Sequence, residues 1–143
     1  MELLAHAARD GAAPDLNVLL AQVPYCAWLG LTARVADGRV VFEMPFAPKL
    51  IGNPVIPAIH GGVIGSLLET AALVQTVWDT KAQSFPKPVD ITIDYLRPAR
   101  AATSFASATL ARQGRRVVNV HATMWQDDEA RPVAGLRGHF LLA

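Results

Sequence analysis

Residues 60–78, HGGVIGSLLETAALVQTVW, constrain the fold of this chain more than any other stretch. The segment is apolar around nearly its whole helical circumference, which is typical of a helix buried inside a domain. It nevertheless carries one carboxylate, Glu69, near its middle. An isolated charge in such a place costs several kcal/mol unless it is paired, hydrated or neutralised. The pattern therefore predicts a central helix around which the rest of the chain folds. It also predicts a functional role for Glu69.

Length and composition indicate one domain that associates with further copies. The chain has 143 residues, enough for one core and too few for two, so we predict a single domain over 1–143. Residues 1–23 are predicted to form its N-terminal helical extension. Hydrophobic residues make up 52% and charged residues 17%, which indicates further apolar surface buried against another subunit. A formal net charge of +1 provides no field for nucleic acid, so we exclude that partner.

Cysteine use and the first residues indicate the compartment. Cys26 is the only cysteine, so there is no internal disulfide and no CxxC pattern, which fits a reducing environment. The opening MELLAHAARD has an early Glu and no basic region, unlike a signal peptide. The central segment approaches membrane length, but His60, Glu69 and Gln75 interrupt it. We therefore expect a cytoplasmic protein without a membrane partner.

The first third of the chain predicts helices followed by a hairpin. Residues 3–23 place leucines at helical spacing, with a break at Gly11 and Pro14, so two short helices are expected there, ended by Pro24. Alternating apolar residues then predict a strand over 29–36. Asp37-Gly38 is a strong hairpin signal, and 39–44 is the predicted return strand.

The remaining segments predict a sheet that surrounds the central helix. Residues 45–59 contain four prolines and are expected to form a stiff, irregular loop that leads to the start of the helix. A polar connector over 81–88 follows the helix. Four strand-like stretches complete the chain, at 89–96, 102–111, 116–126 and 132–142. The order predicts an α+β domain whose antiparallel sheet curls around one long helix.

One face of the predicted helix is suited to a ligand. At about 100° per residue, small and polar residues share a narrow stripe with a single leucine: Gly62, Gly65, Ser66, Glu69, Leu73 and Thr76. At the helix start, Gly61 and Gly62 offer unpaired backbone N–H groups at the positive end of the helix dipole. Such donors can stabilise a developing oxyanion. Two helical turns, roughly 10 Å, separate these groups from Glu69, so we predict a site shared between two subunits.

Each of these residues also has a structural interpretation. Glu69 could be an interface residue that accepts hydrogen bonds from a partner's backbone. His60 could cap the helix, and the two glycines could permit close helix crossing. Asn53, in Gly-Asn-Pro, could be a turn residue. None of these alternatives is decided by the sequence.

Taken together, the motifs resemble those of the hotdog-fold acyl-CoA thioesterases. The shared features are Asn53, His60-Gly61-Gly62, Glu69 nine residues after the histidine, and DITIDYLRPAR at 90–100. The similarity extends from about Pro24 to the C-terminus. It is greatest to the branch that includes the phenylacetate-pathway thioesterases and one type of 4-hydroxybenzoyl-CoA thioesterase. The resemblance implies the hotdog fold, in which an antiparallel sheet wraps around one central helix.

The resemblance also implies a reaction and roles for four residues. Gly61 would donate its N–H to the thioester carbonyl, helped by Asn53. Glu69 of the other subunit would act as general base on water or as nucleophile, and His60 would orient the loop. The products would be a free acid and coenzyme A. The implied assembly is a homodimer, with a dimer of dimers expected, and neither a metal nor a cofactor beyond the coenzyme A of the substrate.

Further residues are candidates for binding the substrate. Some relatives have a serine where this chain has Pro88, and others have a threonine four residues after the glutamate, where this chain has Leu73. Ser66 and Thr70 are therefore the candidate helper residues. Gly62 is a further candidate for binding the substrate. Arginines of the RPAR and RQGRR segments are candidates for the phosphates of coenzyme A: Arg97, Arg100, Arg112, Arg115 and Arg116.

Two other functions are compatible with these motifs. The segment GNPVIPAI also resembles part of the hotdog dehydratases that act on β-hydroxyacyl thioesters, but the preceding PFAPKLI contains no histidine to serve as their base. A protein that binds acyl thioesters without turning them over is the third possibility, because the usual Ser and Thr helpers are missing. Hydrolysis is the predicted activity.

Overall fold

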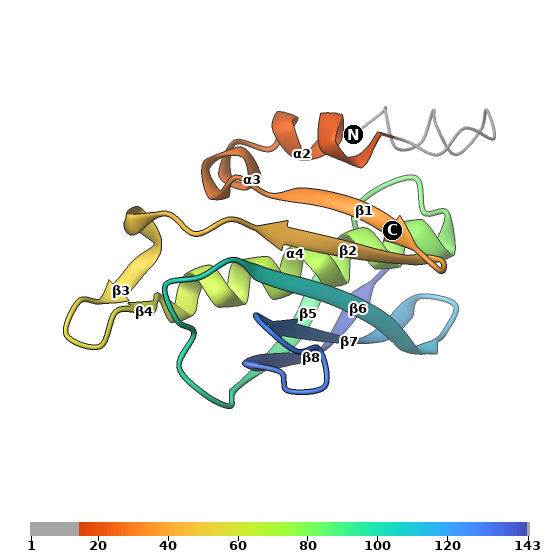
Figure 1. Ribbon diagram of the computed structural model, residues 1–143. Helices are drawn as coiled ribbons and strands as arrows, with labels where there is room; N and C mark the ends of the chain where they lie inside the picture. The colour runs from red at the N-terminus through yellow and green to blue at the C-terminus, as the bar shows by residue number, and fades with distance from the viewer. Residues whose placement is uncertain (1–14, 143) are drawn as a thin grey trace.

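Helix α4, Gly61–Thr80, runs through the domain as predicted. The computed structural model describes residues 15–142. Figure 1 shows α4 lying along one curved sheet, and it contacts β2, β6, β7 and β8. The side chains turned toward the sheet are apolar and buried, among them Val63, Leu67 and Ala71. The helix ends at Lys81, which adopts a left-handed conformation with φ 56°.

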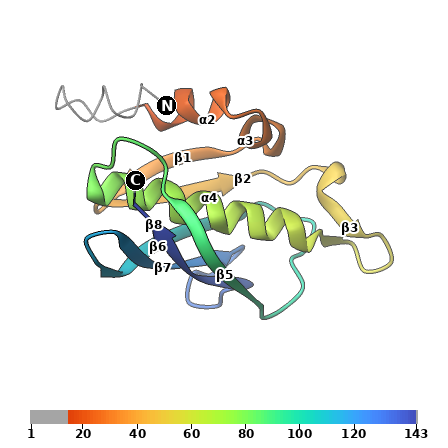
Figure 2. The ribbon, with the colours of Figure 1, turned by 180° about the vertical axis from the view of Figure 1, so that it is seen from behind.

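A six-stranded antiparallel sheet has the order β1-β2-β6-β7-β8-β5. The sheet therefore places its last strand in sequence beside the strand that follows the helix, and Figure 2 shows β5 and β8 from behind. The α+β class and the sheet wrapped around one long helix are confirmed. The strands are β1 Thr32–Ala36, β2 Arg39–Met44, β5 Lys87–Tyr95, β6 Ser104–Gln113, β7 Val117–Trp125 and β8 Ala134–Leu141.

The predicted hairpin is confirmed, whereas the segment before it differs from the prediction. Asp37 and Gly38 have φ angles of 52° and 74°, as a two-residue hairpin turn requires. Pro24 does not merely end a helix, because it also begins α3, Pro24–Leu29. Proline is favoured in the first turn of a helix, where its missing N–H would have no partner. Gly30, with φ 71°, ends α3, so strand β1 begins at residue 32 and not at 29.

The N-terminal extension is described from residue 15. Helix α2, Leu16–Gln22, is capped by the Asp15 carboxylate, which accepts hydrogen bonds from the N–H groups of the next turn. Asn17 exchanges two hydrogen bonds with the backbone of Ala33, which fixes α2 to β1. The other helix predicted for this extension lies outside the described residues.

The proline-rich loop is more regular than predicted. It contains the short 3-10 helix η1, Pro48–Leu50, and a hairpin of β3, Ile51–Asn53, with β4, Ala58–Ile59. Prolines stand at the ends of these pieces and not within the paired residues, which is where proline is tolerated. Figure 1 shows the hairpin projecting from the domain at the end where α4 begins. Ile59 donates to the carbonyl of Ala99, so the hairpin is tied to the segment after β5.

Within residues 15–142, no helix combines the length and the apolar character needed to cross a membrane.

Candidate active site

The start of α4 is held by His60. Its Nδ1 accepts a hydrogen bond from the N–H of Gly62 at 2.9 Å, and its own backbone N–H donates to the carbonyl of Leu50 at 2.8 Å. A side chain on Gly52 would lie within 3 Å of His60 atoms, so only glycine lets the loop approach this closely. His60 is thus a helix cap that joins the hairpin to α4, which is the structural interpretation given for it above.

The two glycines after His60 are not equivalent. The N–H of Gly62 is already used by His60, whereas no described residue accepts a hydrogen bond from the N–H of Gly61. Gly61 is instead bound through its carbonyl, which accepts a hydrogen bond from the Tyr95 hydroxyl at 2.9 Å. A Cβ on Gly61 would lie 3.3 Å from that hydroxyl. The free donor at the helix N-terminus is therefore the N–H that the resemblance assigns to the oxyanion.

Glu69 lies eight residues further along α4 and is half-buried. Among the described residues, no side chain or backbone group forms a hydrogen bond or ion pair with its carboxylate. The rise of an α-helix places it about 12 Å along the axis from Gly61. Within one protomer, these two groups are therefore too far apart to act on the same atom.

The small-residue stripe is open only in its first half. Gly62 is exposed and Gly65, Ser66 and Glu69 are partly exposed, whereas Thr76 is fully buried. The Ile93 side chain lies 3.0 Å from where a Cβ on Gly65 would be, so β5 covers that side of the stripe. The stripe is not open to a ligand as far as Thr76, because that side chain is buried inside the domain.

Ser66 and Thr70 both donate their hydroxyl hydrogens to the helix itself. Ser66 Oγ donates to the Gly62 carbonyl at 2.8 Å, and Thr70 Oγ1 donates to the Ser66 carbonyl at 2.7 Å. Thr70 also forms a hydrogen bond with Cys26 of α3, and burial raises the pKa of that thiol although this hydrogen bond opposes the shift. Thr70 thus faces α3, and Ser66 lies one turn from both Gly62 and Glu69.

Asn53 ends strand β3 and its side chain stabilises the tip of the hairpin. Its Oδ1 accepts hydrogen bonds from the N–H groups of Val55 at 3.0 Å and Ile56 at 3.4 Å. Asn53 therefore acts as a turn residue, as its structural interpretation supposed. No described residue accepts a hydrogen bond from the Asn53 side-chain NH₂, which leaves that group available as a donor.

The candidate arginines divide between the two ends of α4. Arg97 and Arg100 line a cavity beside the strand that leads into the helix, and Arg115 lines another cavity together with Thr80 at the helix C-terminus. Arg112 and Arg116 are exposed near Arg115, at the turn between β6 and β7. The sequence grouped all five, and the fold separates them by the length of the helix.

Two residues at this end of the domain were not singled out from the sequence. From the sequence, Tyr95 is only a residue of a predicted strand, and Arg131 lies only between the predicted strands 116–126 and 132–142. The alternation of side chains along β5 places the Tyr95 ring beside the helix start, so this pattern could have indicated the residue. Nothing in the local pattern around Arg131 indicates a site. Among the described residues, no group of three or more His, Cys, Asp or Glu side chains could hold a metal ion.

Comparisons with known proteins show similarity to acyl-CoA thioesterases. The model of the acyl-CoA thioesterase N-terminal domain family matches residues 52–141. Medium/long-chain acyl-CoA thioesterase YigI of Salmonella typhimurium is 30% identical over 95 aligned positions, and the match covers 57% of this chain and 61% of that protein. The chain therefore matches less than two thirds of that relative's length.

Solved structures extend the match to the whole fold. A protein of Chromobacterium violaceum is 35% identical, with coverage of 100% of this chain and 98% of that one and a TM-score of 0.78. A phenylacetic acid degradation-related protein of Ralstonia eutropha has the same fold, with a TM-score of 0.76 at 22% identity over 98% of this chain and 99% of that chain. Since the family model spans more than half of the chain, from the β3–β4 hairpin to the last strand, the protein belongs to the acyl-CoA thioesterase family.

Proposed function

We propose that this protein hydrolyses acyl-CoA thioesters at a site shared between two subunits. Gly61 of one subunit binds the thioester carbonyl oxygen through its N–H. Glu69 of the other subunit acts as general base on the attacking water or as nucleophile on the carbonyl carbon. Free acid and coenzyme A leave as products. The observation that carries the proposal is the unused Gly61 N–H at the positive end of α4, beside a Gly61 carbonyl and a Gly62 N–H that are both hydrogen-bonded.

The uncompensated Glu69 carboxylate supports the second half of the proposal. A carboxylate that is half-buried in an apolar helix and has no partner among the described residues lowers the free energy of unfolding. Its presence therefore favours a functional role. The small residue one turn before it, Ser66, is partly exposed on the same face and leaves room for a ligand there. The name of the Salmonella relative favours an aliphatic acyl chain of medium or long length.

The free edge of the sheet supports a dimer. Strand β5 pairs only with β8 among the described residues, so its other edge presents unpaired backbone groups. Val89, Tyr95 and Leu96 are exposed there to 64%, 57% and 55%. A second copy placed on this edge would cover apolar surface, and its α4 would approach the helix start that Tyr95 and Ile93 flank. A homodimer built in this way would let Glu69 reach the Gly61 of its partner.

Two substitutions at Gly61 test the oxyanion role. Gly61→Pro removes the N–H, and its cost to the backbone is small because proline is favoured at the first helical position and His60 already has the extended ψ of 133° that a following proline requires. Gly61→Ala adds the same Cβ and keeps the N–H. With medium-chain acyl-CoA and free thiol as the readout, we expect Gly61→Pro to lower kcat about 100-fold relative to Gly61→Ala. Equal rates for the two variants would contradict the oxyanion role.

Glu69→Gln tests the second role with a neutral side chain of the same shape. We expect turnover to fall by at least about 100-fold while the melting temperature is retained, because the change removes a charge and not packing. Thiol release at the wild-type rate from Glu69→Gln would refute the mechanism. Hydration of an enoyl thioester without thiol release would favour the dehydratase instead.

A further inference from the structure

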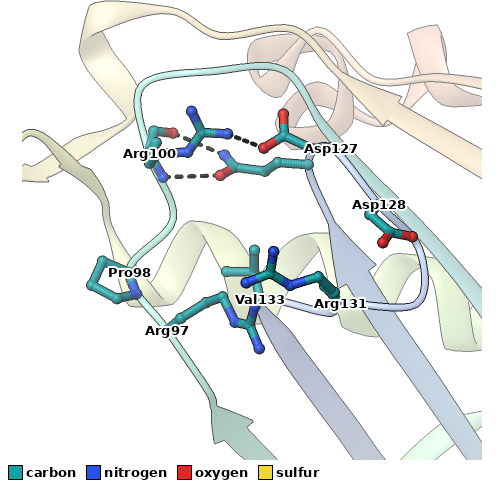
Figure 3. A pocket seen from close by; sticks show the side chains of 8 residues that line it. Arg97, Pro98, Arg100, Asp127, Asp128, Arg131 and Val133 are labelled. Atoms are coloured by element: carbon teal, nitrogen blue, oxygen red, sulfur yellow. Dashed lines mark hydrogen bonds and ion pairs between the residues drawn. The ribbon is translucent and has the colours of Figure 1, made fainter.

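The Glu69 carboxylate differs from the other carboxylates of the described residues. Most of these accept a hydrogen bond or form an ion pair, as Asp127 does with Arg100 in Figure 3. Among the described residues, Asp37 and Glu43 also lack such a partner, but both are exposed to water. Within this part of the chain, Glu69 is thus the one carboxylate that is both partly buried and unpaired. A polar group of that kind predicts a hydrogen-bond donor beside it that comes from outside the subunit.

One turn before Glu69, the Ser66 hydroxyl can only accept a further hydrogen bond. Its single hydrogen is donated to the Gly62 carbonyl at 2.8 Å. A serine oxygen still has lone pairs with which to accept, and no described residue donates to Ser66 Oγ. Ser66 is partly exposed on the open part of the stripe. The stripe therefore presents two neighbouring acceptors and no donor between them.

The other hydroxyl groups of α4 distinguish this arrangement from ordinary helix structure. Thr70, Thr76 and Thr80 also donate to the carbonyl four residues earlier, at 2.7–2.8 Å, as hydroxyl residues within helices often do. Thr76 is fully buried, and Thr80 lies at the far end of α4. The Thr70 hydroxyl is also bound to Cys26 of α3. Of the four hydroxyl groups on α4, that of Ser66 is the one that remains available on the open part of the stripe.

The spacing of the two acceptors suits one water molecule. Side chains three residues apart on an α-helix have Cβ atoms about 5–6 Å apart. Two O–H···O hydrogen bonds of about 2.7 Å each span a similar distance. A molecule that joins two acceptors must donate a hydrogen to each, and water has two hydrogens to donate. With both directed toward Ser66 and Glu69, its oxygen lone pairs point away from α4 and toward a ligand on this face.

We infer that Ser66 and Glu69 of one subunit hold the water that attacks the thioester bound at Gly61 of the other subunit. This inference rests on the proposed hydrolysis and decides between its two forms, because a water held in this way makes Glu69 a general base and not a nucleophile. Ser66 contacts the attacking water and is therefore a further catalytic residue.

The reaction then balances with these groups alone. The water oxygen forms a bond to the carbonyl carbon, one of its protons moves to Glu69, and the electron pair of the C=O bond moves onto the oxygen at the Gly61 N–H. When the C–S bond breaks, Glu69 returns its proton to the sulfur of coenzyme A. The second hydrogen of the water is donated to Ser66 during the attack and stays on the new acid group.

Ser66→Ala and Ser66→Thr test the role of the hydroxyl in turnover. With medium-chain acyl-CoA and free thiol as the readout, we expect Ser66→Ala to lower kcat about tenfold at an unchanged KM. Ser66→Thr should restore kcat, because threonine also donates to the carbonyl four residues earlier and keeps its lone pairs. Thr80→Val is the matched control, since it removes a hydroxyl that is bound in the same way. Equal kcat in Ser66→Ala and Thr80→Val, or a loss confined to Thr70→Val, would overturn the inference.

Competition between water and methanol tests the same role independently of folding. Methanol has one hydroxyl hydrogen, so it can donate to Glu69 but not to Ser66 at the same time. In Ser66→Ala, hydrolysis loses a hydrogen bond that methanolysis never had, so the ratio of methyl ester to free acid should rise about tenfold over wild type at a fixed methanol concentration. Mass spectrometry would measure this ratio. Because the same folded molecules form both products, a loss of active protein leaves it unchanged.

The outcomes separate the water site from the reaction itself. Thiol release that depends on Glu69, with an unchanged product ratio in Ser66→Ala, would reject the water site and retain hydrolysis. No thiol release from any acyl thioester by the wild type would reject hydrolysis and the water site together.

Discussion

Tyr95 and His60 both bind the peptide group between Gly61 and Gly62, Tyr95 at its carbonyl and His60 at its N–H. His60 binds the next N–H along α4, and the Tyr95 hydroxyl donates to the Gly61 carbonyl. Neither side chain occupies the Gly61 N–H, which belongs to the preceding peptide group, so both fix the neighbouring peptide without competing with the substrate. Tyr95 acts in this account as a positioning residue, since its contact is with Gly61 and not with reacting atoms.

Tyr95→Phe measures that positioning effect. The variant removes the 2.9 Å hydrogen bond to Gly61 and keeps the ring that lies beside Gly61. Since a neutral hydrogen bond contributes about 1 kcal/mol, we expect kcat to fall about fivefold and KM to stay the same. A rise of KM at constant kcat would instead indicate that the hydroxyl binds the substrate.

Asn53→Asp separates the two roles of the hairpin asparagine. Aspartate keeps the oxygen that accepts from Val55 and Ile56, but it lacks the NH₂ group. If the NH₂ helps to bind the thioester oxygen, kcat/KM of Asn53→Asp should fall at least about tenfold at an unchanged melting temperature. Asn53→Ala, which also loses the turn, serves as the comparison. Full activity in Asn53→Asp would leave the residue with its turn role alone.

At the level of elements, helix α4 is joined to the β1–β2 hairpin by one buried side chain. Gln75 accepts a hydrogen bond from the N–H of Val40 at 2.8 Å and donates to Asp79 at 2.9 Å and to the Gly38 carbonyl at 3.3 Å. Its side chain is thus fully used in a site that excludes water. This joint lies toward the C-terminal end of α4, away from the proposed oxyanion donor.

Gln75→Leu should destabilise the fold without slowing catalysis. The substitution leaves the Val40 N–H buried without its acceptor, which costs about 1–3 kcal/mol. Denaturant unfolding followed by circular dichroism would measure the loss. Thr76→Val is the matched control, because the neighbouring buried hydroxyl only donates to the Ala72 carbonyl of its own helix. A Gln75→Leu variant as stable as Thr76→Val would contradict the structural role of Gln75.

On the scale of the whole molecule, the proposed site exists only between subunits. Gly61 and Glu69 of one α4 lie about 12 Å apart along the helix axis. Strand β5 leaves an open edge with exposed apolar residues beside the start of that helix. A second copy placed there would bring together the halves that one chain keeps apart.

Mixing two inactive variants tests the shared site. Unfolding and refolding Gly61→Pro together with Glu69→Gln should give mixed dimers in which one of the two sites has both groups intact. Random pairing predicts about a quarter of the wild-type activity. Each variant refolded alone provides the baseline. No recovery, with mixed dimers confirmed by mass spectrometry, would show that the two groups act within one subunit or not at all.

Local patterns were sufficient to predict the main elements. The apolar periodicity of 60–78 predicted α4, its buried faces and its start at the glycines. Asp37-Gly38 predicted the hairpin, and period-two alternation predicted the later strands. These features depend on neighbouring residues, so they can be seen in a single sequence. The same dependence on local patterns explains the errors. A proline such as Pro24 is compatible with the end of one helix and with the start of the next. The β3–β4 pairing lies within a proline-rich segment whose sequence has no regular pattern.

The sequence by itself determined the α+β class, the central helix, the His60-Gly61-Gly62 start and the isolated Glu69, since each follows from composition, periodicity and turn chemistry. Only the tertiary structure decided which glycine N–H stays free, that Tyr95 binds the Gly61 carbonyl, and that Arg97 faces Arg131 while Arg115 lies at the other end of α4. Apart from the local hydrogen bond between His60 and Gly62, those contacts join residues far apart in the chain. They depend on strand order and register, which no local pattern encodes.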